Sequence, residues 1–149
     1  MTTLASLSKL APREAAEQLF AAHKTQRAWL DEFAASLDRR RAGQSLARTL
    51  GVWDVSQSQA ARLFGVSRQA VSKWLAQGAP AERAQAIADL AAATDLLVRY
   101  LKRDRIPAVA RRPVPAANGD SLIDLLGQGR TPELLALCRA MFSFDQAHR

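Results

Sequence analysis

The chain has 149 residues, of which 48% are hydrophobic and 23% charged, a balance that fits one domain, or one domain with a small appendage, around an apolar core. Its 21 Lys and Arg residues outnumber 14 Asp and Glu residues, and the net charge of +7 favours nucleic acid as a partner over a membrane, because no stretch approaches the roughly 18 apolar residues that a membrane span needs. The single cysteine, Cys138, excludes an internal disulfide and a cysteine-based zinc site, and the N-terminus lacks a secretory signal, so we expect a bacterial cytoplasmic protein.

The first predicted segment is an N-terminal helical arm, residues 1–42. Residues 1–11 show no clear period and are expected to be frayed, whereas Pro12 suits the first turn of a helix. From Arg13 to about Arg40 the apolar residues follow a helical stripe, which is interrupted between His23 and Arg27 and so indicates a kinked helix or two helices. The arm is either a dimerisation element or a cover for the core of the next segment.

The second predicted segment, residues 43–102, begins with a break at Gly43. The next residues, Gln44 to Leu50, are expected to form a helix that buries Leu46, Ala47 and Leu50. A connection follows at residues 51–55, and its Trp53 is expected to fill the side of the core.

The stretch from Ser56 to Gln77, SQSQAARLFGVSRQAVSKWLAQ, has the spacing of a helix-turn-helix DNA reader. Its first helix is predicted from about Ser58 to Phe64, with Ser56 or Ser58 as N-cap and an inner face of Ala60, Ala61 and Phe64. Gly65 supplies the left-handed conformation that ends this helix. Ser67 then caps a second helix, Arg68 to Ala76, whose inner face is Ala70, Val71 and Trp74.

The outer face of the second helix carries side chains of the kinds that read base edges. Arg fits guanine O6 and N7, Gln fits adenine N6 and N7, and Ser or Lys reaches bases or phosphates. We therefore predict DNA contacts from Ser56, Gln57, Ser58, Ser67, Arg68, Gln69, Ser72 and Lys73. The alternative is an ordinary helical hairpin with a solvated polar face.

A long helix is predicted from Pro80 to about Lys102, and a basic stretch follows its end. The stretch contains one acidic residue, Asp104, and six basic residues: Arg99, Lys102, Arg103, Arg105, Arg111 and Arg112. Phosphate contact and a solvated basic surface are both open interpretations. For the earlier run from Arg39 to Arg41, a helix C-terminus is a commoner explanation than phosphate contact, because the helix dipole attracts cations there.

The third predicted segment, residues 103–149, ends in a helical hairpin. Residues 107–119 contain three prolines and are expected to be an irregular connection to short helices at 121–127 and 131–142. The hairpin has more apolar residues than it can hide within itself, which favours a partner or dimer surface separable from the reader over docking on the long helix. That surface is predicted to comprise Leu122, Ile123, Leu126, Leu134, Leu137, Met141 and Phe142.

The sequence contains no pattern typical of an enzyme, a cofactor site or a metal site. His23 and His148 lie at opposite ends of the chain without metal-ligand spacing. Gly127-Gln128-Gly129 lacks the strand and the third glycine of a dinucleotide site. We therefore expect a protein that is not an enzyme and needs neither cofactor nor metal.

The chain resembles the Xre/MbcA/ParS antitoxins, in which an Xre-type reader precedes a small toxin-binding domain. The reader resemblance lies in Gln44 to Gln77. The tail resemblance lies in Arg112-Pro113, Asn118-Gly119-Asp120-Ser121 and Leu125-Leu126, so that the likeness covers roughly Gln44 to Leu137. This resemblance implies repression of the protein's own operon and neutralisation of a toxin, often one that acts on NAD.

The sequence thus predicts an all-α protein of about six or seven helices that binds a double-stranded DNA operator as a homodimer and represses transcription. A cognate toxin is the further expected partner, and the protein would lie on the nucleoid when bound to DNA. The alternative is a stand-alone phage, plasmid or chromosomal regulator whose C-terminal segment mediates dimerisation or protein contacts.

Overall fold

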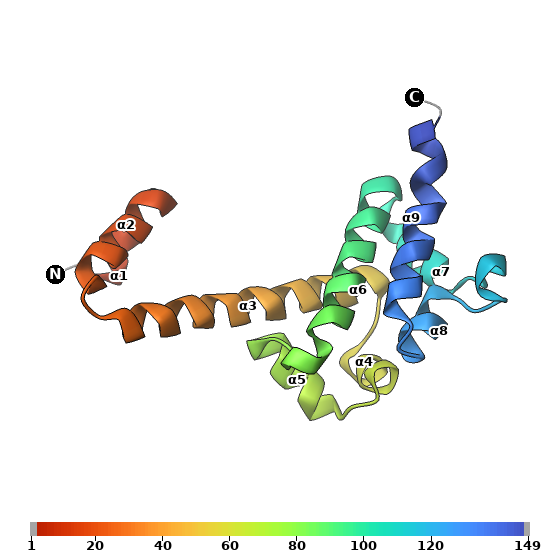
Figure 1. Cartoon of the computed structure of the whole chain (residues 1–149), viewed down its shortest axis with the longest axis horizontal. Coiled ribbons are helices and arrows are strands. Elements are labelled where there is room, and N and C mark those ends of the chain that lie inside the picture. The colour runs from red at the N-terminus through yellow and green to blue at the C-terminus, as the bar shows by residue number, and fades with distance from the viewer. Residues whose placement is uncertain (1–2, 148–149) are drawn as a thin grey trace. The chain divides into compact units, whose positions relative to one another are not determined.

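The computed structural model describes residues 3–147, with side chains described through Ser143, and in this part of the chain all regular structure is helical. The predicted all-α class is confirmed. The described residues form nine α-helices, more than expected, because the arm and the basic connection contain additional short helices. The elements are α1 (Leu4–Leu7), α2 (Pro12–His23), α3 (Arg27–Trp53), α4 (Gln57–Phe64), α5 (Arg68–Gln77), α6 (Ala81–Tyr100), η1 (Arg103–Arg105), α7 (Ile106–Arg111), η2 (Pro115–Ala117), α8 (Leu122–Gly127) and α9 (Thr131–Ala147) (Figure 1).

The chain divides into two compact units, residues 1–38 and residues 39–149. In the first unit, the interrupted stripe corresponds to the end of α2 and the start of α3, so two helices are present instead of one kinked helix. Residues 4–7, in the part expected to be frayed, form α1, which Thr3 and Ser6 close with reciprocal capping hydrogen bonds. None of the described residues of this unit is buried.

The expected break at Gly43 is wrong, because α3 continues through this residue to Trp53. Gly43 is buried, and a Cβ added to it would overlap the backbone carbonyl oxygen of Leu75 and lie 2.9 Å from the carbonyl carbon. The glycine therefore permits a close approach between α3 and the end of α5 and does not end a helix. Further along α3, Ala47 was predicted to be buried but is exposed, and Thr49 is buried instead.

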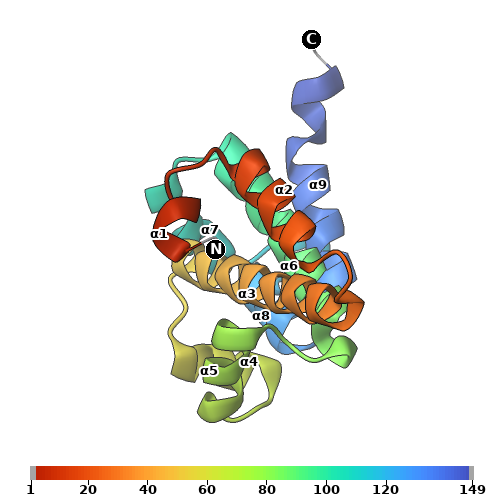
Figure 2. The ribbon, with the colours of Figure 1, turned by 90° about the vertical axis from the view of Figure 1, so that its left-hand side faces the viewer.

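The second unit has a single apolar core, in which Trp53 is buried as predicted. The indole Nε1 of Trp53 donates a 2.9 Å hydrogen bond to the hydroxyl of Thr94 in α6, so its polar atom is satisfied inside the core. Helix α9 packs along α6 (Figure 2), and α8 contacts α4, α7 and α9.

The C-terminal hairpin is part of this core, which corrects the prediction of a separable apolar surface. Leu122, Leu126 and Leu134, all predicted at a partner surface, are 0%, 3% and 0% exposed. α9 docks along α6, and α8 packs against α4 and α7, and these contacts hide the side chains that the hairpin could not have hidden within itself.

The connection predicted to be irregular contains helix α7, with Pro107 in its first turn, where the missing N–H costs no hydrogen bond. Its inner residues Ile106 and Ala110 are buried. From its last turn, Arg111 donates 2.9 Å hydrogen bonds to the carbonyl oxygens of Trp53 and Asp54. These two carbonyls lie at the end of α3, where helix carbonyls lack intrahelical partners, so Arg111 caps α3.

Candidate nucleic-acid interface

Helix α4 starts with a complete capping box, and Ser56 is its N-cap as predicted. The Ser56 hydroxyl accepts from the backbone N–H of Gln59 at 3.1 Å, and the Gln59 side chain accepts from the backbone N–H of Ser56 at 2.9 Å. Gln57 and Ser58 follow in the first turn, where backbone N–H groups have no intrahelical acceptor, and both residues are exposed. This end of α4 therefore presents donors and a positive dipole end to an anion such as a phosphate.

A three-residue turn, Gly65 to Ser67, joins α4 to α5. Gly65 has φ 66° and ψ 36°, the left-handed conformation that glycine adopts without steric cost. The hydroxyl of Ser67 accepts from the backbone N–H of Ala70 at 3.1 Å, so Ser67 caps α5 as predicted. Both helix ends that meet at this turn are therefore fixed by local contacts.

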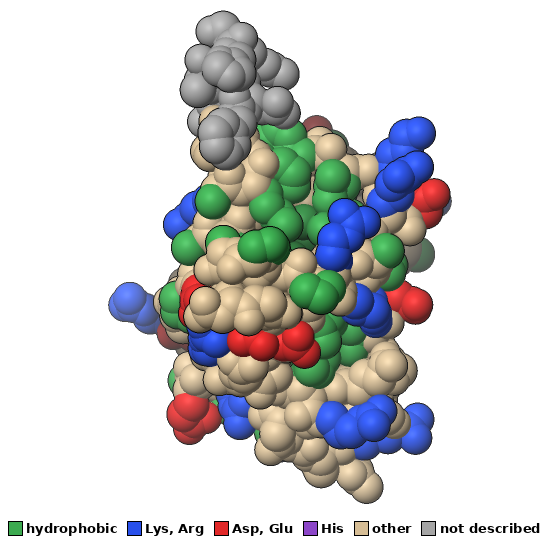
Figure 3. Space-filling model, turned by 90° about the vertical axis from the view of Figure 1, so that its right-hand side faces the viewer, with side chains coloured by type: hydrophobic (Ala, Val, Ile, Leu, Met, Phe, Trp, Pro, Cys, Tyr) green, Lys and Arg blue, Asp and Glu red, His purple; other side chains and the backbone are tan. Residues whose placement is uncertain are grey.

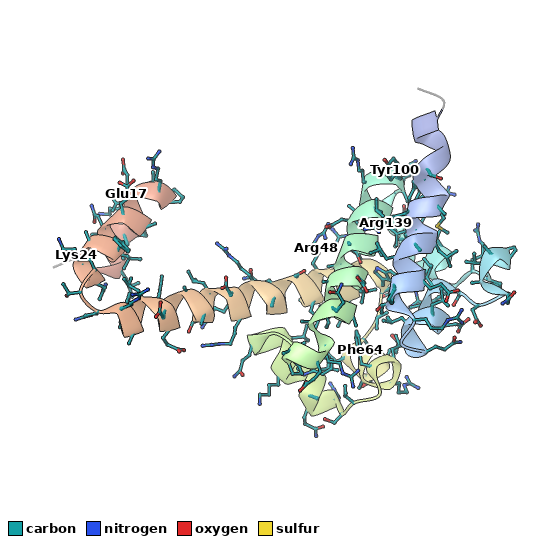
Figure 4. The ribbon with its side chains drawn as sticks, viewed as in Figure 1. Glu17, Lys24, Arg48, Phe64, Tyr100 and Arg139 are labelled. Atoms are coloured by element: carbon teal, nitrogen blue, oxygen red, sulfur yellow. The ribbon has the colours of Figure 1, made fainter. Side chains whose placement is uncertain are left out.

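The inner face of α5 is fixed to the core by Val71 and Trp74, both buried. Phe64, which Figure 4 labels, ends α4. Its ring meets the Trp74 ring edge to face, with ring centres 5.7 Å apart, and so joins α4 to α5. Arg83, at the start of α6, donates a 2.8 Å hydrogen bond to the Phe64 carbonyl oxygen, and its guanidinium lies 5.7 Å from the Trp74 ring centre. This role of Arg83 could not be predicted from the sequence, because it depends on contacts with residues in other helices.

The outer face of α5 consists of exposed polar side chains. Ser67, Arg68, Gln69, Ser72 and Lys73 are all exposed. Among the described residues, the side chains of Arg68, Gln69, Ser72 and Lys73 have no hydrogen bond or ion pair with one another or with the rest of the protein. Their donors and acceptors are thus available to a ligand that approaches this face.

A basic run, Arg39 to Arg41, lies beside the end of α5. A Cβ added to Gly78, which follows α5, would lie 3.0 Å from the Ala42 Cβ and 3.4 Å from the Arg39 carbonyl oxygen. Arg40 and Arg41 are exposed. The sequence placed these arginines at a helix end, but α3 continues for another 12 residues beyond Arg41, so its C-terminal dipole is not the reason for their charge.

The predicted phosphate contacts from residues 99–112 do not lie on the outer face of α5. Arg99 is in the last turn of α6, which starts next to α5 and runs for 20 residues, so it lies about 27 Å along α6 from that start (Figure 1). Arg111, in contrast, lines a pocket with Ser56 and Gln59 at the start of α4. Arg99 lies over the Tyr100 ring, and Lys102, Arg103, Arg105 and Arg112 are exposed. The guanidinium of Arg111 donates hydrogen bonds to the carbonyl oxygens at the end of α3.

The predicted partner residues that stay accessible lie on α8 and α9. Ile123, Leu137 and Phe142 are half-buried, and Met141 is 39% exposed. The Phe142 ring stacks on the Tyr100 ring, with centres 4.6 Å apart. Figure 3 shows hydrophobic side chains gathered in the upper half of the face that it draws.

No other chemical site emerges from the described residues. They contain no group of three or more His, Cys, Asp or Glu side chains placed to hold a metal ion, and none of their helices is long and apolar enough to cross a membrane. Burial raises the pKa of the Cys138 thiol to about 12, which keeps it protonated and unreactive at neutral pH. His148 lies outside the described residues.

Comparison with protein-family models and with curated proteins gave no match. Among solved structures, a chain of the M. tuberculosis MbcT-MbcA toxin-antitoxin complex matches with a TM-score of 0.54 and 22% sequence identity. The match covers 66% of this chain and 91% of that chain. At this level of identity the comparison shows a shared fold.

Proposed function

We propose that the protein is a sequence-specific DNA-binding transcriptional regulator in which α4, the Gly65 turn and α5 form a helix-turn-helix. The observation that carries the proposal is the outer face of α5, where Arg68, Gln69 and Ser72 are exposed and unpaired while the inner face is held in the core. The second helix of such a unit enters the major groove, and Arg and Gln there pair with guanine and adenine edges. Repression follows if the bound site overlaps a promoter.

The rest of the interface supplies affinity without sequence preference. The first amides of α4 and the Ser56 hydroxyl would contact one phosphate, and Lys73 another. Arg40 follows Arg39, whose backbone lies beside the end of α5, and its exposed side chain extends the same positive surface. This interpretation is supported by charge, because residues 39–149 contain 17 Lys and Arg against 9 Asp and Glu, a net charge of +8.

The proposal is tested by replacing Arg68 with alanine and measuring binding to a labelled duplex from upstream of the protein's own gene. We expect a loss of about 1 to 3 kcal/mol, or roughly 5- to 150-fold in affinity, because a bidentate pair with one base is lost. Arg99→Ala is the matched control, since it removes another exposed arginine, in the last turn of α6, and should leave affinity unchanged. Equal losses in both variants would contradict base reading by α5.

A second candidate function, the antitoxin of a toxin-antitoxin pair, is favoured by the fold shared with a chain of the MbcT-MbcA complex. A toxin would contact the accessible residues of the C-terminal hairpin, Ile123, Leu137, Met141 and Phe142, and the buried leucines would support them. Co-expression with the product of the adjacent gene tests this function, and co-purification that Met141→Glu abolishes is the expected result. A chain that binds its own promoter but retains no neighbouring product would be a stand-alone regulator.

A further inference from the structure

The N-terminal unit, residues 1–38, consists of helices without a core of their own. α1 has four residues, α2 has 12, and no described residue of the unit is buried. Isolated helices shorter than about 12–15 residues are marginal in water, and most helices in proteins are stabilised by burial of an apolar face. The unit therefore lacks the contact that would normally stabilise it.

Apolar exposure is concentrated in this unit. Among the described residues, six large hydrophobic side chains are exposed, and five of them lie before residue 39: Leu4, Phe20, Trp29, Phe33 and Leu37. Trp29, Phe33 and Leu37 are spaced four residues apart, so they form one stripe along α3. His23 stacks on Trp29 with ring centres 3.6 Å apart, and Trp29 stacks on Phe33 at 5.2 Å, which holds this stripe together.

The charge of the unit differs from that of the rest of the chain. Residues 1–38 contain four Lys and Arg against five Asp and Glu, a net charge of −1, whereas residues 39–149 carry +8. A nucleic acid is therefore not the partner of this apolar stripe. A nearly neutral surface of mixed charge can pair with an identical surface without repulsion, as a twofold interface requires.

From these observations we propose that residues 1–38 form the dimer interface of the protein, and that their occupant is the same unit of a second copy. The stripe Trp29, Phe33 and Leu37 lies at the centre of the contact, with Phe20 and Leu4 around it. This inference rests in part on the proposed function, because helix-turn-helix proteins bind as dimers to two half-sites about one helical turn apart.

The exposed area is sufficient for such an interface. Phe20, Trp29 and Phe33 are 61%, 39% and 38% exposed. With about 150–250 Å² per aromatic side chain, they leave roughly 200–300 Å² of apolar surface per copy. Two copies double this area to roughly 400–600 Å², and because interfaces are about 56–65% apolar, the aromatic side chains alone correspond to a total of roughly 600–1,100 Å². Leu4 and Leu37 add to this area, which brings it to the size of the smaller specific interfaces, about 1,000–1,200 Å².

The test is the molar mass of the full chain in solution without DNA, by sedimentation or light scattering at tens of micromolar. We expect twice the monomer mass of 16.2 kDa for the wild type and 16.2 kDa for the double variant Phe33→Glu, Leu37→Glu. Each substitution acts twice in a symmetric dimer, so self-association should weaken by at least about 100-fold. Circular dichroism should lose no more than the signal of the arm helices, and the cooperative melt of residues 39–149 should remain, because neither substituted side chain is buried.

Met141→Glu is the matched control, since Met141 is an exposed large hydrophobic residue of the second unit and is nearly as exposed as Leu37. The control should remain dimeric. A monomeric wild type, or a double variant that remains dimeric, would overturn the inference. Loss of the dimer in the control alone would place the interface on α9.

DNA binding separates this test from the test of the proposed function. The double variant should still bind a single half-site. A wild type that is dimeric but does not bind DNA would contradict the proposed function and leave the arm interface standing.

Discussion

Replacing Gly43 by alanine should destabilise the protein by about 2 kcal/mol, although alanine is the better helix former. The added methyl group would overlap the Leu75 carbonyl oxygen and lie 3.3 Å from that of Trp74. Both atoms belong to the backbone of α5, so no side-chain rotation can relieve the overlap. Overpacking costs about 1–3 kcal/mol, a rigid backbone overlap falls at the upper end, and the gain in helix propensity returns about 1 kcal/mol.

Gly51→Ala is the matched control in the same helix. Gly51 is exposed, and a Cβ added to it meets no atom within 4 Å, so alanine should stabilise the protein by up to about 1 kcal/mol. Thermal unfolding followed by circular dichroism separates the two variants. For a protein of this size, 1 kcal/mol corresponds to about 2–4 °C, so Tm should fall by about 4–8 °C in Gly43→Ala and rise slightly in Gly51→Ala.

The same substitution should also weaken DNA binding, because Leu75 and Trp74 lie in the helix proposed to read bases, and their displacement moves its outer face. The reasoning would be refuted if Gly43→Ala raised Tm as much as Gly51→Ala. In that case the close approach of α3 to α5 would not constrain the position of α5.

Two further predictions concern charge and the tail. Replacing Arg40 by alanine should lower the slope of log K against log salt by about 1 on specific and random DNA alike. Replacing Arg99, in the last turn of α6, should leave the slope unchanged, and the opposite outcome would locate the phosphate contacts at that end of α6. Truncation after Arg112 removes five buried leucines. Their burial contributes about 8–15 kcal/mol, which is comparable to the whole free energy of unfolding of a domain, so the shortened chain should lose its helical circular dichroism. A retained cooperative melt would contradict a shared core.

The local features of α4 and α5 could be predicted from the sequence because each depends on residues within one turn of the helix. Ser56 and Ser67 cap the helices that follow them, and Gly65 adopts a left-handed conformation. The buried face of α5 follows from the spacing of Val71 and Trp74. Capping, glycine conformation and helical period are properties of a short stretch, and a single sequence contains them.

Most of the wrong predictions concern contacts between distant parts of the chain, and α1, which a local capping box starts, is the exception. Gly43 resembles a helix breaker until Leu75, 32 residues later, is known to pack against it. The capping role of Arg111 depends on carbonyls 57 and 58 residues earlier. The hairpin leucines have the pattern of an amphipathic surface, and periodicity alone does not distinguish a partner protein from α6 as the element that covers them.

Selection of binding sites from randomised duplexes, with the wild type and with Arg68→Ala, tests base reading by α5 most directly. The proposal predicts that the wild type enriches one motif made of two half-sites related by twofold symmetry. Arg68→Ala should enrich the same motif with the preference lost at one base pair of each half-site, because the other contacts remain. No enriched motif for the wild type, or an identical motif for both proteins, would contradict the assignment of α5 as the recognition helix.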